Sequence, residues 1–356
     1  MWIENARKIL PAWAKNGGDQ TDVVLASRAR LARNLQDLSF PSHASEAAMK
    51  EVLRRVEQAV SAGGSEHGGS DRGFYKLIRM EELPLLERQI LVEKHLVSPQ
   101  HIERPQHRAV ILNADESVST MVNEEDHLRI QAILPGQQIG KATEAADQMD
   151  DILEERLDYA FHEGKGYLTA CPTNTGTGMR VSVMVHLPAL SMIDQTRKVL
   201  SALSQIGLNV RGIYGEGSEA YGDIYQISNQ MSLGRTEEEI LYNLQTACAQ
   251  LVESERAARQ AILRDSRIQV EDRVWRSLGT LSQARLLTSE EARRLTSDVK
   301  LGTDLEIIPA MEGVFLKELL FVTSPGILQK IIGREMSPGE RDEYRAMLVR
   351  DLVNPQ

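Results

Sequence analysis

The 356-residue chain has few aromatic residues (4%) and only two cysteines. Hydrophobic residues nevertheless reach 42% and charged residues 26%, a balance that excludes a disordered chain. We therefore expect a packed core built mainly from Leu, Ile, Val, Ala and Met. Cys171 and Cys248 lie far apart in the sequence and show no metal-ligand spacing, which argues against a disulfide scaffold and favours a reducing cytoplasm.

An excess of positive charge is also lacking, since the formal net charge is -10. Broad binding of nucleic acid or of a membrane surface needs a basic face, so we predict neither. No stretch approaches the length of a transmembrane helix, and the first residues carry charges and a proline where a signal peptide needs an unbroken apolar run. We expect a cytoplasmic protein, in which a local group of arginines can still bind a polyanion.

The common nucleotide-binding and metal-binding motifs are missing as well. The string GQQIGKAT superficially resembles a P-loop, but its glycines are wrongly spaced and Ala142 stands where Ser or Thr must ligate magnesium. A strand followed by GxGxxG, the HRD and DFG kinase signatures, HExxH and CxxC are all absent from the sequence. These absences argue against the ordinary ATP-binding folds, and we predict no metal site held by protein ligands alone.

The periodicity of apolar residues predicts an α+β organisation followed by helices. Helical spacing is found over 45–60, 140–163 and 190–205. Extended patterns are found over 22–30, 109–123, 166–174, 180–187, 208–217 and 223–233. After residue 235 the chain is dense in Glu, Arg, Ala and Leu and is predicted to be almost entirely helical. We therefore expect an α+β domain over residues 1–255 and an all-helical domain over residues 256–356.

Two of the extended segments carry arginines and acids in an unusual arrangement. In ASRARLARN, Arg28 and Arg30 are two residues apart, so on a strand both side chains point to the same face. In VNEEDHLR, Glu125 and Arg129 come just after a predicted strand. Each string alone has an ordinary explanation, because Arg-x-Arg is usually solvated and clustered acids favour the start of a helix.

Two further segments combine glycines with reactive side chains. In CPTNTGTGMRVSVMVHL, Cys171 precedes a glycine-rich turn, and Arg180 and His186 share one face of the following strand. In VRGIYGEGSEAYGD, Arg211 ends a strand and Glu216 lies in a glycine-flanked turn. A lone cysteine is more often a small buried residue, and glycine pairs usually mark simple turns.

Taken together, in this order and spacing, the segments between residues 21 and 235 resemble the phosphagen kinases, a family of guanidino kinases. The strings KHLVSP, CPTNTGTG, RGIYGEGSEA and ISNQMSLG are more similar to the protein-arginine kinase branch than to the small-molecule enzymes. The small-molecule enzymes carry a helical domain before the Arg-x-Arg strand, where this chain has about twenty residues. The resemblance implies an antiparallel β-sheet flanked by helices, of glutamine-synthetase-like type, and a C-terminal helical domain for dimerisation and phosphoarginine binding.

The resemblance implies transfer of the γ-phosphate of ATP, with Mg²⁺, to a guanidinium group. It assigns ATP binding to Ser27, Arg28, Arg30, His95, Arg129, Arg180, His186 and Arg211, with the two histidines near the nucleoside. Arginine forks suit this role because they stay charged and bind phosphate oxygens in pairs. Glu125 and Glu216 match the family's substrate-binding acids, and Cys171 matches its reactive cysteine, which we expect to be a thiolate positioned by nearby cations. Two carboxylates could align the guanidinium, and one could take up its proton.

The C-terminal string SPGERDEYRAML predicts a capped helix. Ser337 is the predicted N-cap, Pro338 falls at the first helical position, and Glu340 stands where it would complete a capping box. Arg341 and Arg345 are four residues apart and share a helix face, which is typical of a salt-bridged surface helix. RDEYRA also resembles the phosphoarginine-binding motif of the protein-arginine kinases, which implies a site at Arg341, Asp342, Arg345 and Ala346.

The same resemblance implies partners that the residues themselves do not reveal. These are protein substrates with exposed arginines, among them a stress-response repressor, a zinc-binding activator protein, a Clp-type unfoldase and protease, and a second copy of the chain. Two alternative functions remain open. One is a small-molecule kinase acting on free arginine, and the other is a catalytically inactive adaptor that binds phosphoarginine.

Overall fold

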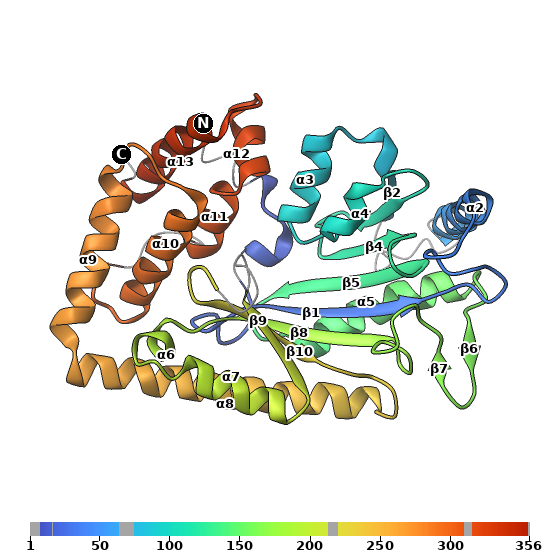
Figure 1. Cartoon of the computed structure of the whole chain (residues 1–356), viewed down its shortest axis with the longest axis horizontal. Helices are drawn as coiled ribbons and strands as arrows, with labels where there is room; N and C mark the ends of the chain where they lie inside the picture. Colours follow the sequence, from blue (N-terminus) through green and yellow to red (C-terminus); the bar gives the residue numbers. More distant parts are fainter. Residues whose placement is uncertain (1–7, 16, 64–74, 213–219, 310–314, 355–356) are drawn as a thin grey trace.

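The computed structural model of the chain describes residues 8–15, 17–63, 75–212, 220–309 and 315–354. Figure 1 shows a part built around a β-sheet and, beside it, a group of helices formed by the C-terminal third of the chain. Within these described residues, no helix is both long enough and apolar enough to cross a membrane. Glu216 lies outside the described residues.

Within the described residues the sheet has eight strands, in the order β2-β3-β4-β5-β1-β8-β10-β9, and all neighbouring strands run antiparallel. Its strands are β1 Val24–Arg33, β2 Tyr75–Arg79, β3 Ala109–Asn113, β4 Val118–Val122, β5 Leu128–Pro135, β8 Met179–His186, β9 Leu208–Gly212 and β10 Ile224–Asn229. As described, β1 lies inside the sheet and β2 and β9 are its outer strands. The predicted antiparallel sheet with flanking helices is confirmed.

The helices of the sheet-containing part cover the sheet and its edges. They are α2 Glu46–Gly63, α3 Leu85–Glu93, α4 Pro99–Glu103, α5 Ile139–Glu154, α6 Pro188–Met192 and α7 Thr196–Gln205. α5 packs against β1 and β5, where alternate apolar residues such as Ala29 and Leu31 are buried. On β8 the alternate residues Val181, Val183 and Val185 are buried in the same core cluster. The period of two in these strands therefore separates an apolar face from a polar one.

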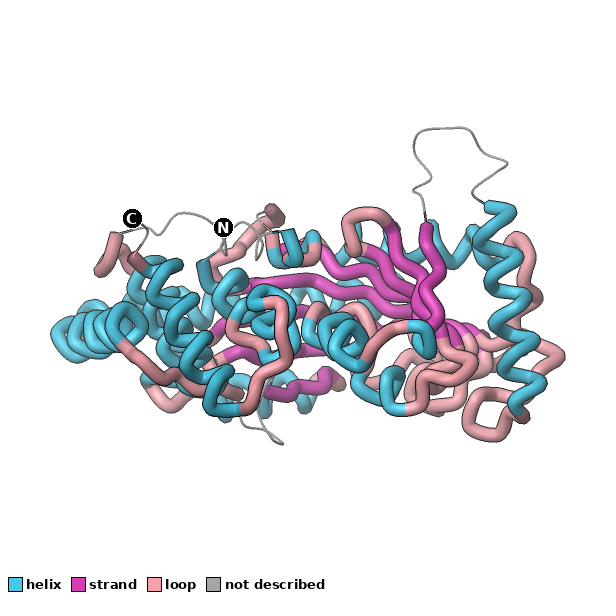
Figure 2. Tube along the Cα trace, turned by 90° about the horizontal axis from the view of Figure 1, so that it is seen from above, coloured by secondary structure: helices cyan, strands magenta, loops and turns pink. Residues whose placement is uncertain are grey.

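The remaining helices are α8 Glu237–Asp265, α9 Arg267–Gln283, α10 Ser289–Asp304, α11 Phe315–Val322, α12 Pro325–Ile332 and α13 Pro338–Val353. α8 runs along the sheet-containing part, and the later helices gather at one end of the molecule (Figure 1). Seen from above, the strands form a layer through the middle, with these helices beyond one end of it (Figure 2). The predicted domain boundary at residue 255 falls inside α8.

Three sequence-based boundaries were wrong. The helix predicted over 140–163 ends at Glu154, because the backbone of Asp158 and Ala160 hydrogen-bonds to the segment that follows β1. The strand predicted over 166–174 is reduced to β7 Gly166–Tyr167, which pairs with β6 Phe161–His162. The helix predicted over 190–205 is split into α6 and α7 by a turn in which Asp194 has a positive φ of 56°.

A buried ionic cluster joins α8 to the sheet-containing part. The carboxylate of Glu255, which is fully buried, accepts hydrogen bonds from the backbone N–H groups of Ala189 and Leu190 at 3.1 and 3.0 Å. It also accepts one from Nε of Arg259 at 2.9 Å. Arg259 in turn donates to the carbonyl oxygen of Asp22 at 2.9 Å, just before β1. Because both charges are buried, each depends on the other for compensation.

Replacing Arg259 by Ala should lower the free energy of unfolding by about 3–5 kcal/mol, since Glu255 would keep a buried charge without its cation. Urea denaturation followed by circular dichroism measures this loss. Arg264→Ala is the matched control, because Arg264 lies on the same helix but pairs with Asp265 in an exposed position, where no measurable change is expected. Equal stability of the two variants would contradict a structural role for the buried pair.

Candidate functional site

The register of the sheet gathers five arginines on one face. Arg30 of β1 lies opposite Arg180 of β8, and Ala32 of β1 lies opposite Arg129 of β5. Residues that face each other across antiparallel strands, or stand two apart on one strand, point to the same side of the sheet. Pairing of β10 with β8 and β9 extends this face to the outer strand β9. The five arginines are Arg28, Arg30, Arg129, Arg180 and Arg211.

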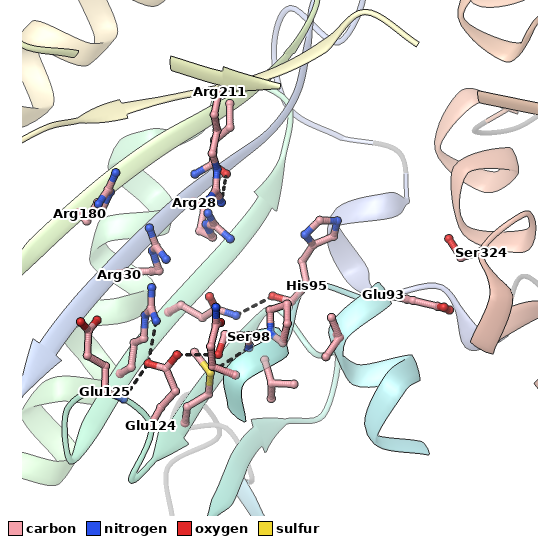
Figure 3. Close-up of a pocket in the computed structure, with 18 of the residues that line it drawn as sticks. Arg28, Arg30, Glu93, His95, Ser98, Glu124, Glu125, Arg180, Arg211 and Ser324 are labelled. Atoms are coloured by element: carbon pink, nitrogen blue, oxygen red, sulfur yellow. Dashed lines mark hydrogen bonds and ion pairs between the residues drawn. The ribbon is translucent and has the colours of Figure 1, made fainter. Parts of the chain in front are cut away.

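These arginines line a cavity of about 880 Å³. Its other charged or titratable lining residues are Glu93, His95, Glu124, Glu125 and Arg293. Figure 3 shows Arg28, Arg30, Arg180 and Arg211 along the strands, with Glu124 and Glu125 on one side and His95 on another. Of the predicted site residues, the structure therefore brings together the five arginines, His95 and Glu125.

The concentration of positive charge perturbs the arginines themselves. Burial, together with repulsion from Arg129, Arg211 and Arg180, lowers the pKa of Arg28 to about 9. Burial and the same kind of repulsion lower the pKa of Arg30 well below its usual range. A group of partly buried like charges is costly unless an anion compensates it. The cavity is therefore suited to a ligand that carries several negative charges.

Glu124 holds one of these arginines in place. Its carboxylate accepts hydrogen bonds from Nη1 of Arg129 at 2.7 Å, from Oγ of Ser98 at 2.6 Å and from the backbone N–H of Glu125 at 3.0 Å. Burial acts to raise the pKa of Glu124, but Arg129 and these hydrogen bonds bring it down to about 2. This role of Glu124 was not predicted from the sequence, although the acidic doublet in NEEDHLR was an available signal.

Glu125, the next residue, behaves differently. Its side chain is exposed to the cavity, and partial burial of the carboxyl together with the neighbouring Asp126 raises its pKa. Arg129 opposes this shift. A carboxylate with a raised pKa is a better proton acceptor than an ordinary glutamate. The doublet thus supplies one carboxylate that orients a cation and one that is available for a ligand.

His95 borders both the large cavity and a small apolar pocket. The small pocket is lined by Trp13, Ala26, Arg28, His95, Ile133, Ser182, Met184 and Gln226. Burial and the charges of Arg28 and Arg211 lower the pKa of His95 to about 3, so its imidazole is neutral. The rings of Trp13 and His95 pack edge to face, with a distance of 5.5 Å between their centroids. This pocket has a volume of only about 20 Å³, too small for a nucleobase, so His95 contributes to ligand binding through the neutral ring that it presents to the large cavity.

His186 is a correction to the sequence-based site. It shares the face of Arg180 as predicted, but it is fully buried at the end of β8, where Nε2 lies 2.8 Å from Oγ of Ser297 on α10. The strand thus carries His186 beyond the cavity and under the helical region. Met184, two residues earlier on the same face, borders the small pocket instead.

Ser27 also lies outside the cavity, because it faces the opposite side of β1 from Arg28. Its hydroxyl donates to the carbonyl oxygen of Gly136 at 2.8 Å and accepts from the N–H of Gln138 at 2.9 Å. Ser27 therefore anchors the turn that leads from β5 into α5.

Cys171 lies on a loop near the arginines rather than among the residues that line the cavity. Its Sγ is 3.0 Å from Oγ1 of Thr173. The pKa of Arg180 is lowered by burial and by other arginines, and Cys171 and Glu125 act in the opposite direction. Both groups are therefore close enough to Arg180 to interact with its charge.

The glycines after Cys171 allow close approach of the backbone. Gly176 and Gly178 have positive φ values of 119° and 70°. A Cβ atom on Gly178 would lie 2.7 Å from the carbonyl oxygen of Ala32, and one on Gly176 would lie 2.9 Å from Cα of Leu233. The loop can therefore pack against the end of β1 and against the segment after β10 only with glycine at these positions.

The C-terminal motif lies on α13, away from the cavity. Ser337 caps this helix and forms the predicted capping box with Glu340. Arg345 is buried and donates to the carbonyl oxygens of Thr323 at 2.8 Å and Leu287 at 2.7 Å. It also pairs with Asp342, while Arg341 donates to the carbonyl oxygen of Met336 and Ala346 is buried. The salt-bridged surface helix that the spacing alone favours does not describe Arg345, which joins α13 to two neighbouring segments. The phosphoarginine site at these residues stays a prediction.

Replacing Arg30 by Met should raise the stability of the protein in anion-free buffer by about 1–4 kcal/mol, because a partly buried cation is removed from a group of like charges. It should also reduce the stabilisation that inorganic tripolyphosphate gives the parent protein. Differential scanning calorimetry with and without tripolyphosphate measures both effects. Arg104→Met, at an exposed position after α4, should change neither. Lower stability of Arg30→Met in anion-free buffer would contradict this account of the cavity.

Comparisons with known proteins agree with this geometry. Residues 51–258 match the ATP:guanido phosphotransferase C-terminal catalytic domain, and residues 267–355 match the protein-arginine kinase McsB C-terminal domain. The protein-arginine kinase of Halothermothrix orenii is 49% identical over 349 residues, which is 98% of this chain and 97% of that protein. That of Bacillus subtilis is 48% identical over 345 residues, covering 97% and 94%. A crystal structure of lombricine kinase is similar with a TM-score of 0.60 and 25% identity, covering 72% of this chain and 71% of that one.

Proposed function

Since the chain belongs to the protein-arginine kinase branch of the ATP:guanido phosphotransferases, we propose that it phosphorylates arginine side chains of proteins with ATP as the donor. The observation that carries this proposal is the cavity in which five arginines face an available carboxylate, Glu125. Phosphoryl transfer depends mainly on positioning and on neutralising charge, and this cavity supplies the groups for both.

The arginine face binds the phosphates of ATP. Guanidinium forks donate two parallel hydrogen bonds to phosphate oxygens, and their charge stabilises the oxygens as the bond to the γ-phosphate breaks. Glu124 keeps the guanidinium of Arg129 directed to the cavity. The nucleoside lies at the end of the large cavity that is bordered by the neutral ring of His95.

The acceptor guanidinium enters beside Glu125 and Cys171. A resting guanidinium is a cation without an available lone pair, so its proton must leave as the N–P bond forms. Glu125 binds the guanidinium, orients it and accepts this proton. Glu216, which lies outside the described residues, remains the predicted second carboxylate.

Mg²⁺ fits this site as a companion of ATP, because it would reduce the negative charge on the phosphates during transfer. Among the residues that the structure describes, no group of three or more His, Cys, Asp or Glu side chains could hold a metal ion. The ion would therefore be held mainly by the phosphates, with Glu124 and Glu125 as the nearby carboxylates of the cavity.

The two alternatives differ in what the same residues would do. An inactive phosphoarginine-binding adaptor would have no use for five arginines arranged around a carboxylate. A kinase for free arginine would use the same cavity, and the similarity to enzymes named protein-arginine kinases over almost the whole chain favours a protein substrate. We further propose, on the family resemblance alone, a cytoplasmic dimer with a zinc-binding activator that marks proteins for Clp-type degradation during stress.

Incubating the chain with labelled ATP, Mg²⁺ and an unfolded arginine-rich protein should give acid-labile label on the protein. Glu125→Gln should reduce the rate by at least about 100-fold, since it removes both a ligand of the guanidinium and its proton acceptor. Glu103→Gln, at an exposed position on α4, is the control and should retain full activity. Label on free arginine alone would favour the small-molecule kinase. Failure of transfer alongside tight phosphoarginine binding would favour the adaptor.

The acid limb of activity should report the carboxyl of Glu125. This group must be ionised to accept a proton, so kcat/KM should rise with pH through its raised pKa. Asp126→Asn removes the neighbouring negative charge and should move this limb to lower pH. The variant keeps an oxygen for the two hydrogen bonds that Oδ1 of Asp126 accepts from Asn34 and Ala170. A pH–rate profile measures the shift, and an unchanged limb would argue that another group accepts the proton.

A further inference from the structure

The helical region contributes directly to the wall of the catalytic cavity. Ser324 and Pro325, at the start of α12, and Arg293, on α10, line the same cavity as the five arginines. In Figure 3, Glu93 is directed toward the helix that carries Ser324, and His95 lies between Glu93 and Arg28. The surroundings of the ligand are therefore shared between the sheet and the C-terminal helices.

Glu93 makes the link between these two parts. One oxygen of its carboxylate accepts from the backbone N–H of Gly326 at 2.7 Å, and the other accepts from that of Ile327 at 2.8 Å. These N–H groups belong to the first turn of α12 and have no partners within the helix. The hydroxyl of Ser324, at the N-cap position, donates instead to the carbonyl oxygen of Leu320. Glu93 thus caps α12 from another element, and its charge suits the positive end of the helix.

The start of α12 is also held from its other side. Arg345 of α13 donates to the carbonyl oxygen of Thr323, immediately before the N-cap. Gly326 allows Glu93 to come close, because a Cβ atom there would lie 3.0 Å from Oε2 of Glu93. α12 therefore offers Glu93 a fixed anchor.

His95 follows Glu93 after a single residue. α3 ends at Glu93, and His95 then adopts a left-handed conformation with a φ of 61°. This conformation is uncommon for residues other than glycine, although histidine adopts it more readily than most. Trp13 donates to the carbonyl oxygen of Lys94 at 3.1 Å, and Gln131 donates to that of His95 at 2.8 Å. These two hydrogen bonds hold the turn that carries the imidazole from one side, and the contact of Glu93 with α12 holds it at the end of α3.

We propose that Glu93 is a positioning residue, through which α12 sets the place of His95 and thereby the affinity of the cavity for the nucleoside part of ATP. This inference rests on the proposed function, since it takes ATP as the ligand. The arginines that bind phosphate lie on the strands, so they are independent of this link. The link through Glu93 accordingly acts on one end of the nucleotide site and leaves the end that binds phosphate unchanged.

The matched pair of variants is Glu93→Gln and Glu87→Gln. Glutamine at 93 can accept only one of the two hydrogen bonds, and its NH₂ group would meet the N–H donor of the other. Glu87 lies on the same helix α3 and also contacts α12, through an exposed ion pair with Lys330. Glu87→Gln therefore removes the same charge from the same pair of helices without touching the turn at His95.

Calorimetric titration with ATP and with inorganic tripolyphosphate separates the two ends of the site. Glu93→Gln should weaken ATP binding by about tenfold, the cost of a lost charge-assisted hydrogen bond, and leave tripolyphosphate binding unchanged. Glu87→Gln should leave both unchanged. In kinase assays, Glu93→Gln should raise KM for ATP with little effect on kcat. His95→Ala should weaken ATP binding, and adding Glu93→Gln to it should weaken it no further.

Retained tripolyphosphate binding also shows that the variant is folded. Equal loss of ATP and tripolyphosphate binding by Glu93→Gln would overturn the proposal, since Glu93 would then be merely structural. Unchanged ATP binding, additive effects with His95→Ala, or the same loss in Glu87→Gln would overturn it too. The titrations need no phosphoryl transfer, so they test this inference independently of kinase activity. If the protein transferred no phosphate but Glu93→Gln still weakened ATP binding alone, the proposed function would be wrong and this inference would be supported.

Discussion

Repulsion among five guanidinium groups is the constraint around which the sheet is organised. Arg28 and Arg30 cannot move apart, because β1 is paired on both sides and its alternate residues are buried against α5. The apolar face of the strands therefore holds the cationic face together. Glu124 offsets part of the repulsion at Arg129, and a bound polyanion completes the compensation. Repulsion among the arginines lowers the free energy of unfolding of the ligand-free protein. Burial of the apolar face of the same strands offsets this loss.

Much of this arrangement could be predicted from strand periodicity. The alternation in β1 and β8 correctly placed Arg28, Arg30 and Arg180 on one face, because side-chain direction along a strand is a local property. How far the cavity extends along β8 is a tertiary property, set by the helix that covers the end of the strand. The side chain of His186 therefore points to the predicted face of the sheet, but it lies under α10 rather than in the cavity. The contact between Glu93 and α12 joins residues 233 positions apart, and the sequence near either one contains no sign of the other.

Among the contacts between the helical region and the sheet-containing part, two differ clearly in character. Glu255 and Arg259 form a buried pair that ties α8 to the start of α6 and to the segment before β1. Glu93 forms a smaller contact at the margin of the cavity, where one carboxylate meets two N–H groups. The first contact sets the relative position of the two parts. The second contact borders the cavity, so a small displacement of Glu93 would change the contacts of a bound ligand.

Because β9 is an outer strand of the described sheet, it can open locally and release a ligand without unfolding of the whole domain. Arg28, Arg30, Arg129 and Arg180 lie on strands with neighbours on both sides, whereas Arg211 lies on β9, which pairs only with β10 in the described sheet. Edge strands open locally at a much lower cost than the whole domain. Local opening of β9 would move Arg211 away from the cavity and weaken the binding of a polyphosphate, while the other four arginines remain in place. A product can thus leave a very cationic site without the fold having to loosen around it.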